Sequence, residues 1–178
     1  MKFGVLRRGQ FQGFLALGLT LVALSGHQAL AGLPASVERT FEQSFGDDSV
    51  YMPLDCNINT LHLLEHLRAS GQNLRTWKVI YLSGASVLQG PTADGSVQMD
   101  GSGLDPVNPR GGPVHWIFHV VAYKAGYVLD MDYGDVPRIL TWNEWLDGQF
   151  GPGKADSIGT RSYRADLYVR QYSDRIPT

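Results

Sequence analysis

The apolar positions between residues 33 and 71 predict two helices. In the first, over 33–45, apolar side chains recur four residues apart at Val37, Phe41 and Phe45, which marks one helical face. The second begins at Asn57 and ends at Gly71, a residue typical of helix ends. Its apolar stripe consists of Ile58, Leu61, Leu64 and Leu67.

The remainder of the chain has mainly the short apolar runs of β-strands. We expect strands over 77–82, 115–122, 126–131 and 163–172, a short helix over 139–150, and a long surface loop over 83–113. A short turn at Lys124-Ala125 would join the middle two strands as a hairpin. Helices followed by mostly antiparallel strands predict the α+β fold class.

The first residues have the pattern of a secretory signal. A positive start at Lys2, Arg7 and Arg8 precedes the apolar run Phe11 to Leu24, and Ala29-Leu30-Ala31 offers small residues to a signal peptidase. The alternative is a membrane anchor, which the short apolar run disfavours. We expect cleavage near Ala31, leaving residues 32–178 as one domain exported to the periplasm or the exterior.

Composition narrows the function classes. The chain has 178 residues, of which 43% are hydrophobic and 18% charged, so a single globular domain is expected. A formal net charge of −2 gives no electrostatic reason to expect a nucleic-acid partner. After signal cleavage we expect a monomer with no membrane contact.

The chain has one cysteine, Cys56, directly before the second predicted helix. Unpaired N–H groups at a helix start favour the thiolate, which is the nucleophilic form. Asp55 stands where an N-cap is expected. The competing interpretation is that Cys56 is a small buried hydrophobic residue, the usual fate of a free cysteine.

His119 and Asp130 give Cys56 possible partners. With a two-residue turn at Lys124-Ala125, these two residues would lie directly opposite each other in the hairpin. A carboxylate beside an imidazole orients the ring and stabilises its charged form. A thiol at a helix start with this pair on a later hairpin is a papain-like arrangement. These residues alone leave peptidase, deamidase and transferase activities open.

Several segments resemble the protein N-terminal glutamine amidohydrolase family. Cys56-Asn57-Ile58-Asn59 is similar to its Cys-x-x-Asn motif, and residues 114–121 are similar to its Val-x-Trp-x-x-His-Val-Val strand. Leu129-Asp130-Met131-Asp132 resembles its Asp-x-Asp segment, and Tyr172-Ser173-Asp174-Arg175 resembles its Ser-Asp-Arg end. The segments occur in order from Cys56 to Arg175.

The resemblance implies a papain-like fold and a Cys56–His119–Asp130 triad. It implies hydrolysis of the side-chain amide of an N-terminal glutamine, giving glutamate and ammonia without metal or cofactor. The candidate substrate-binding residues are Asn59, Trp116 and Asp132.

Two features depart from the family: the export signal, and Asn57-Ile58 where the family has an acidic pair. An internal glutamine, as used by secreted protein-glutaminases, is therefore the alternative substrate.

His62-Leu63-Leu64-Glu65-His66 also matches the inverted zinc-peptidase motif H-x-x-E-H. The sequence shows no third ligand on a later helix, so a solvated helix face is favoured. Four aromatic residues could line a substrate groove or belong to the core: Trp116, Tyr133, Trp142 and Trp145. Strand alternation predicts that Trp116 faces away from His119. A non-catalytic binding domain with a buried cysteine remains the third possibility.

Overall fold

A computed structural model describes residues 33–49, 51–84, 88–91, 97–99 and 103–173. The expected signal segment 1–31 lies outside these residues, as do Asp174 and Arg175 of the C-terminal resemblance. In the described residues, no helix is both long and apolar enough to cross a membrane.

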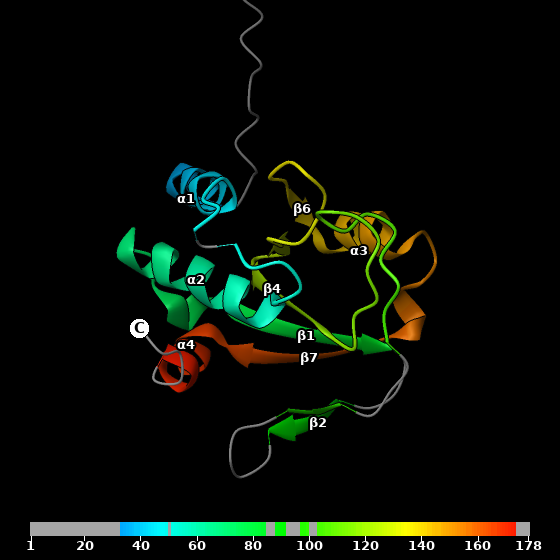
Figure 1. Cartoon of the computed structure of the whole chain (residues 1–178). Helices are drawn as coiled ribbons and strands as arrows, with labels where there is room; N and C mark the ends of the chain where they lie inside the picture. The colour runs from blue at the N-terminus through cyan, green and yellow to red at the C-terminus, as the bar shows by residue number, and fades with distance from the viewer. Residues whose placement is uncertain (1–32, 50, 85–87, 92–96, 100–102, 174–178) are drawn as a thin grey trace, which may run out of the picture.

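The fold is α+β, with N-terminal helices packed on an open antiparallel sheet (Figure 1). Helices α1 (Ala35–Phe45) and α2 (Cys56–Ala69) precede the 3-10 turn η1 (Leu74–Thr76). The sheet has five strands in the order β6-β5-β4-β1-β7. They are β1 (Lys78–Gly84), β4 (His119–Lys124), β5 (Tyr127–Leu129), β6 (Ile139–Thr141) and β7 (Ile158–Arg164).

Hydrophobic residues cover both faces of the sheet. Along β1, Val79 and Tyr81 face α1, α2 and α4 (Ala165–Ser173), whereas Ile80 and Leu82 face a second core. That second core includes residues of α3 (Trp142–Phe150). Figure 1 shows α1, α2 and α4 together on one side and α3 on the other. A sheet buried on both faces explains why β1 is apolar at consecutive positions.

The hairpin exists, but its predicted register is wrong. Ala122 pairs with Leu129, and Lys124 with Tyr127, so the turn residues are Ala125 and Gly126. Both have positive φ, 51° and 93°, as a type I′ turn requires, and glycine provides that conformation without strain. Because the partner positions shift by two residues, every side chain keeps its predicted face.

The prediction of a strand over 163–172 is also wrong. Strand β7 ends at Arg164 and α4 follows at once, because Ala165, Tyr168 and Val169 are buried at helical spacing. The first three residues of the predicted helix over 139–150 form strand β6 instead. The helix α3 begins at Trp142, with a capping box made by Thr141 and Glu144.

The predicted loop over 83–113 contains regular structure in its described parts. Strands β2 (Leu88–Pro91) and β3 (Val97–Met99) form a two-stranded sheet. Further along, Leu104 makes a β-bridge with Trp116, and Pro109 makes one with Tyr133. These two bridges bring residues 104–110 to the end of the main sheet where β4 begins. Residues 85–87, 92–96 and 100–102 of the expected loop lie outside the described part.

Candidate functional site

Cys56 is the first residue of α2. Asp55 is the N-cap, as predicted, and its side chain accepts a hydrogen bond from the Ile58 backbone N–H at 3.4 Å. The thiol is 6% exposed and points to the Phe118 carbonyl, 3.9 Å from Sγ. Cys56 is therefore a buried cysteine, but it lies beside the first residue of β4 rather than among aliphatic side chains alone.

Two polar contacts fix the position of helix α2 along strand β4. Thr60 donates a 2.9 Å hydrogen bond to the Val120 carbonyl, one helical turn beyond the contact between Cys56 and Phe118. Four helical residues rise about 6 Å and two strand residues about 6.6 Å, so the two contacts repeat with matching spacing. This packing places the start of α2 at the start of β4, where His119 stands.

His119 and Asp130 meet, although they are not a directly opposite pair. The His119 Nε2 atom lies 2.9 Å from Asp130 Oδ2, and neither side chain is more than 1% exposed. The same Oδ2 accepts a 3.0 Å hydrogen bond from Trp145 Nε1, and Oδ1 accepts one of 2.9 Å from the Asp132 backbone N–H. Since a carboxylate only accepts, the hydrogen belongs to Nε2, and Nδ1 is the basic atom of the neutral ring.

The Cys56 thiol is close enough to the His119 ring to influence its pKa. Among the described residues Nδ1 is buried without a hydrogen-bond partner. Burial lowers the pKa of His119, but the charge and hydrogen bond of Asp130, followed by the neighbouring Cys56 thiol, raise it well above its usual value. The thiol, the imidazole and the carboxylate are therefore neighbours, which is the arrangement that proton transfer from a thiol to an imidazole would need.

Two tryptophans fix the plane of the imidazole. The Trp116 ring stacks on His119 with centroids 4.0 Å apart and planes 6° from parallel, and the Trp145 centroid is 6.2 Å away. The prediction that Trp116 faces away from His119 is wrong. Strand β4 begins only at His119, so strand alternation does not apply to residue 116. Trp145 was expected in a groove or in the core, and no signal in the sequence pointed to its hydrogen bond with Asp130.

Asn59 lies beneath the site and is fully buried. Its amide accepts from the Met52 N–H at 2.7 Å, and donates to the Met52 carbonyl at 2.9 Å and to Asp132 Oδ1 at 3.1 Å. These bonds fasten the segment preceding Cys56 to the Asp-x-Asp segment. Asn59 therefore links two segments of the site, and its role in substrate binding stays a prediction.

Asp132 is 4% exposed and lies next to Asp130. Burial and then the Asp130 charge raise the pKa of Asp132 to about 6, against the opposing effects of His119 and the hydrogen bonds from Asn59 and Tyr51. The carboxyl group consequently changes charge near neutral pH.

A cavity of about 330 Å³ adjoins these residues. Its lining comprises Tyr51, Pro53, Leu54, Arg110, Gly111, Gly112, Pro113, Val114, Trp116 and Asp132. The Arg110 guanidinium lies between the rings of Phe45 and Tyr51, 4.1 and 3.8 Å from their centroids. No motif in the sequence pointed to Arg110 or Tyr51.

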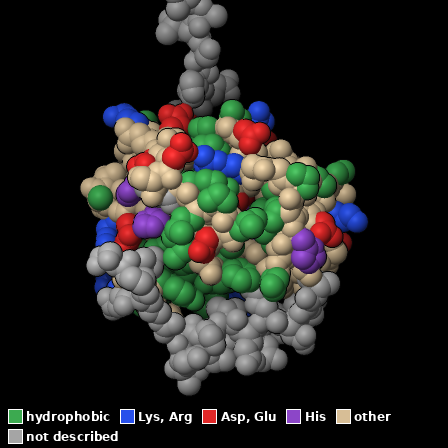
Figure 2. All heavy atoms as spheres, viewed as in Figure 1, with side chains coloured by type: hydrophobic (Ala, Val, Ile, Leu, Met, Phe, Trp, Pro, Cys, Tyr) green, Lys and Arg blue, Asp and Glu red, His purple; other side chains and the backbone are tan. Residues whose placement is uncertain are grey.

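The rim of this cavity is partly apolar. Leu54 is 72% exposed and has a φ of 67°, an uncommon conformation for a residue with a side chain. Figure 2 shows hydrophobic side chains gathered near the centre of the viewed face, with charged side chains around them. The lining of the cavity therefore combines apolar side chains with the buried carboxyl of Asp132.

A metal ion is a further possibility at the same place. One ligand atom each of His119, Asp130 and Asp132 lie within 4.8 Å of one another. Each of these three side chains already makes a hydrogen bond, to Asp130, to Trp145 and to Asn59. These hydrogen bonds occupy Nε2 of His119, Oδ2 of Asp130 and Oδ1 of Asp132.

The H-x-x-E-H motif lies on α2, away from this cluster. His66 Nδ1 is 2.9 Å from Ser44 Oγ, and Glu65 accepts a 2.7 Å hydrogen bond from Ser173. His62 Nδ1 is 3.9 Å from Glu65 Oε2, and both side chains are about one-third exposed, at 32% and 30%. Within the described ranges, the residues of this motif are not part of any group able to hold a metal ion.

Comparison with known proteins adds no assignment. No protein-family model matches the chain, and no curated protein sequence matches it either.

Proposed function

We propose that the chain is a cysteine-dependent amidohydrolase that converts an N-terminal glutamine of a peptide or protein into glutamate and releases ammonia. One observation carries the proposal: the buried His119 ring is held by Asp130 at Nε2, its Nδ1 has no hydrogen-bond partner in the described part of the chain, and Cys56 is a neighbour of the ring. The resemblance of the Cys56, His119 and Asp-x-Asp segments to the amidohydrolase family supports the choice of reaction.

The chemistry needs only groups of this chain and water. His119 Nδ1 takes the thiol proton, and Cys56 Sγ attacks the side-chain carbonyl carbon of glutamine. N–H groups at the start of α2, that of Cys56 included, stabilise the oxyanion. The imidazolium then protonates the departing amide nitrogen, which leaves as ammonia. In the second half His119 takes a proton from water, the resulting hydroxide attacks the thioester, and the thiol is regenerated.

Asp132 supports the preference for an N-terminal glutamine. The substrate's free ammonium group needs an anionic partner, and Asp132 is a buried carboxyl in the wall of the cavity. The family's acidic pair after the nucleophile is absent, since Asn57-Ile58 stands there. In our proposal Asp132 supplies the missing negative charge.

A papain-like fold and export after cleavage near Ala31 belong to the same proposal. The papain-like fold is supported by the position of the thiol on a helix that packs on an antiparallel sheet, with His119 at the start of β4 and Asp130 directly after β5. The charged start, apolar run and small residues of 1–31 support export.

The deciding experiment measures ammonia released from two peptides that differ only at the amino end. We expect rapid release from a peptide beginning with glutamine and little from the same peptide with an acetylated amino group. Equal release from both peptides would contradict a preference for N-terminal glutamine and would favour an internal glutamine as the substrate. Release that a chelator abolishes and a thiol alkylator spares would exclude the thiol mechanism in favour of a metal-dependent one.

A further inference from the structure

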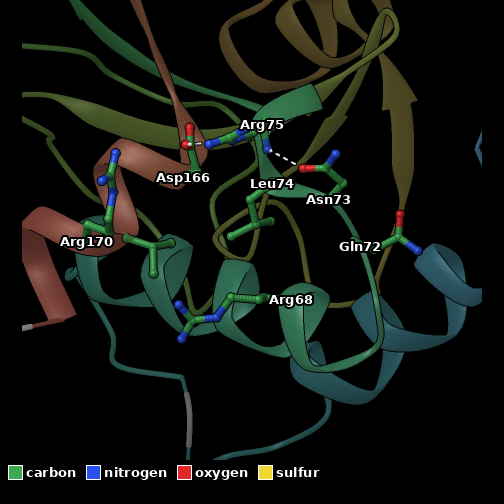
Figure 3. A pocket seen from close by; sticks show the side chains of 8 residues that line it. Arg68, Gln72, Asn73, Leu74, Arg75, Asp166 and Arg170 are labelled. Atoms are coloured by element: carbon green, nitrogen blue, oxygen red, sulfur yellow. Dashed lines mark hydrogen bonds and ion pairs between the residues drawn. The ribbon is translucent and has the colours of Figure 1, made fainter.

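A second cavity, of about 400 Å³, lies at the other end of α2 (Figure 3). Its lining includes Arg68 of α2, Leu74 and Arg75 of η1, and Asp166, Val169 and Arg170 of α4. Arg68 is twelve residues beyond Cys56 on the same helix, or about 18 Å along its axis. The cavity is therefore separate from the proposed thiol site.

Three guanidinium groups line this cavity, and among the described residues none of them donates a hydrogen bond to a carboxylate. Arg75 Nε is 3.9 Å from Asp166, and Arg68 is 3.9 Å from Glu65, distances too long for a hydrogen bond. For Arg170 the described residues show only a longer-range attraction to Asp166. Figure 3 shows Arg75 and Asp166 directed toward each other, with Arg170 on the α4 side and Arg68 on the α2 side.

The single carboxylate of the lining does not neutralise these charges. Asp166 is already engaged by Arg164, which donates from Nε at 3.0 Å and from Nη2 at 2.7 Å. This two-point pairing satisfies Asp166 from outside the cavity lining. The cavity consequently carries an excess of positive charge in a chain whose formal net charge is −2.

The floor of the cavity is apolar. Leu74 is 5% exposed and Val169 is 1% exposed, so both belong to the core beneath the arginines. A volume of about 400 Å³ is in the range of small-molecule sites, and is larger than a bare anion needs. Guanidinium groups around an apolar floor match an organic molecule that carries a phosphate group.

We propose that the cavity of Arg68, Arg75 and Arg170 binds the phosphate group of a small organic phosphomonoester. Two or three arginines donate charge-assisted hydrogen bonds to the phosphate oxygens, while Leu74 and Val169 contact the organic part. This inference does not depend on the proposed thiol chemistry.

The test is a binding titration of the full chain with phenyl phosphate, with inorganic phosphate and with chloride, all at one ionic strength. We expect saturable binding of phenyl phosphate, weaker binding of inorganic phosphate, and no saturable effect of chloride. Tighter binding of inorganic phosphate than of phenyl phosphate would identify the free anion as the ligand and overturn the organic part of the proposal.

Arginine variants locate the binding. Arg75→Gln and Arg170→Gln should each weaken phenyl phosphate binding about tenfold, the effect of losing one charge-assisted hydrogen bond. Arg138→Gln removes the same charge from an exposed position outside the cavity lining and should leave binding unchanged. Circular dichroism checks that all three variants are folded. Absence of saturable phosphate binding, or equal weakening by Arg138→Gln, would overturn the proposal.

Discussion

Asp130 and Trp145 are joined by a 3.0 Å hydrogen bond from the indole nitrogen to the carboxylate oxygen that also contacts His119. The other oxygen of Asp130 accepts from the backbone of Asp132. Three donors therefore hold one buried carboxylate in a single orientation. An acid fixed in this way can orient the imidazole and keep its pKa high without moving.

Replacing that acid should move the pH dependence of the reaction. The charge and hydrogen bond of Asp130 raise the pKa of His119 against the effect of burial, so Asp130→Asn should lower this pKa. In the pH profile of kcat/KM, the limb assigned to His119 should shift to lower pH, and the maximal rate should fall at least about tenfold. Trp145→Phe keeps the charge and should leave the limb in place. An unmoved limb in Asp130→Asn would contradict the role of this carboxylate.

Replacing Trp116 should lower kcat in addition to lowering the stability of the fold. Trp116→Leu removes the ring stacked on His119 and should lower kcat about tenfold to a hundredfold, because a small misplacement of a catalytic group is costly. The free energy of unfolding should fall by about 2–4 kcal/mol.

Trp77→Leu is the matched control for that variant. Trp77 is fully buried in the other core, so its replacement should destabilise the protein to a similar extent while kcat per folded molecule is retained. Equal loss of kcat in both variants would reduce Trp116 to a packing residue.

Asn59 should be the strongest positioning residue outside the triad. Asn59→Leu removes three hydrogen bonds and should cost about 2–4 kcal/mol of unfolding free energy, with a further loss of kcat because the segment before Cys56 is released. As a control away from the site, Ser44→Ala removes the hydrogen bonds to the Thr40 carbonyl and to His66, and should cost about 1 kcal/mol with little change in kcat. Chemical denaturation and steady-state kinetics separate the two effects. Retained kcat in Asn59→Leu would contradict the positioning role.

Asp132 should make stability depend on pH. The pKa of Asp132 is about 6 in the folded chain, above its usual value of 3.8, so its ionisation is harder in the folded state than in the unfolded one. Its contribution to stability is fully present below pH 3.8 and is lost as the pH rises through 6. Asp132→Asn should therefore gain stability relative to the parent over this window, by up to roughly 3 kcal/mol. A difference between the two proteins that does not vary with pH would contradict the raised pKa.

The sequence predicted α1, α2 and the fold class because their signals are local. The apolar stripes, the cap at Asp55 and the break near Gly71 all act within one turn of the chain. The contact between His119 and Asp130 was predicted correctly, although the predicted hairpin register was wrong. A shift of two residues keeps each side chain on the same face of the sheet, so the contact does not depend on the exact register. The prediction of a strand over 163–172 was wrong because a short apolar segment fits the helical and the strand periodicity equally well.

The surroundings of His119 and Asp130, namely the two tryptophans and the adjoining cavity, could not be predicted from the sequence. Trp116 stacks on His119 at a place where its backbone forms a β-bridge with Leu104, and no local sequence pattern predicts that bridge. The bond of Trp145 to Asp130 depends on how α3 packs on the sheet, which is a tertiary relationship. The cavity at Arg110 and Tyr51 joins segments distant in the sequence in the same way.

The most direct test of the whole account is ammonia release from a glutamine-initiated peptide by the parent chain and by Cys56→Ser. The substitution changes one atom of a nearly buried side chain, so the variant should keep its fold and its unfolding midpoint. The account predicts steady ammonia release by the parent and none above background by the variant. Full release by Cys56→Ser, or no release by the folded parent, would contradict it.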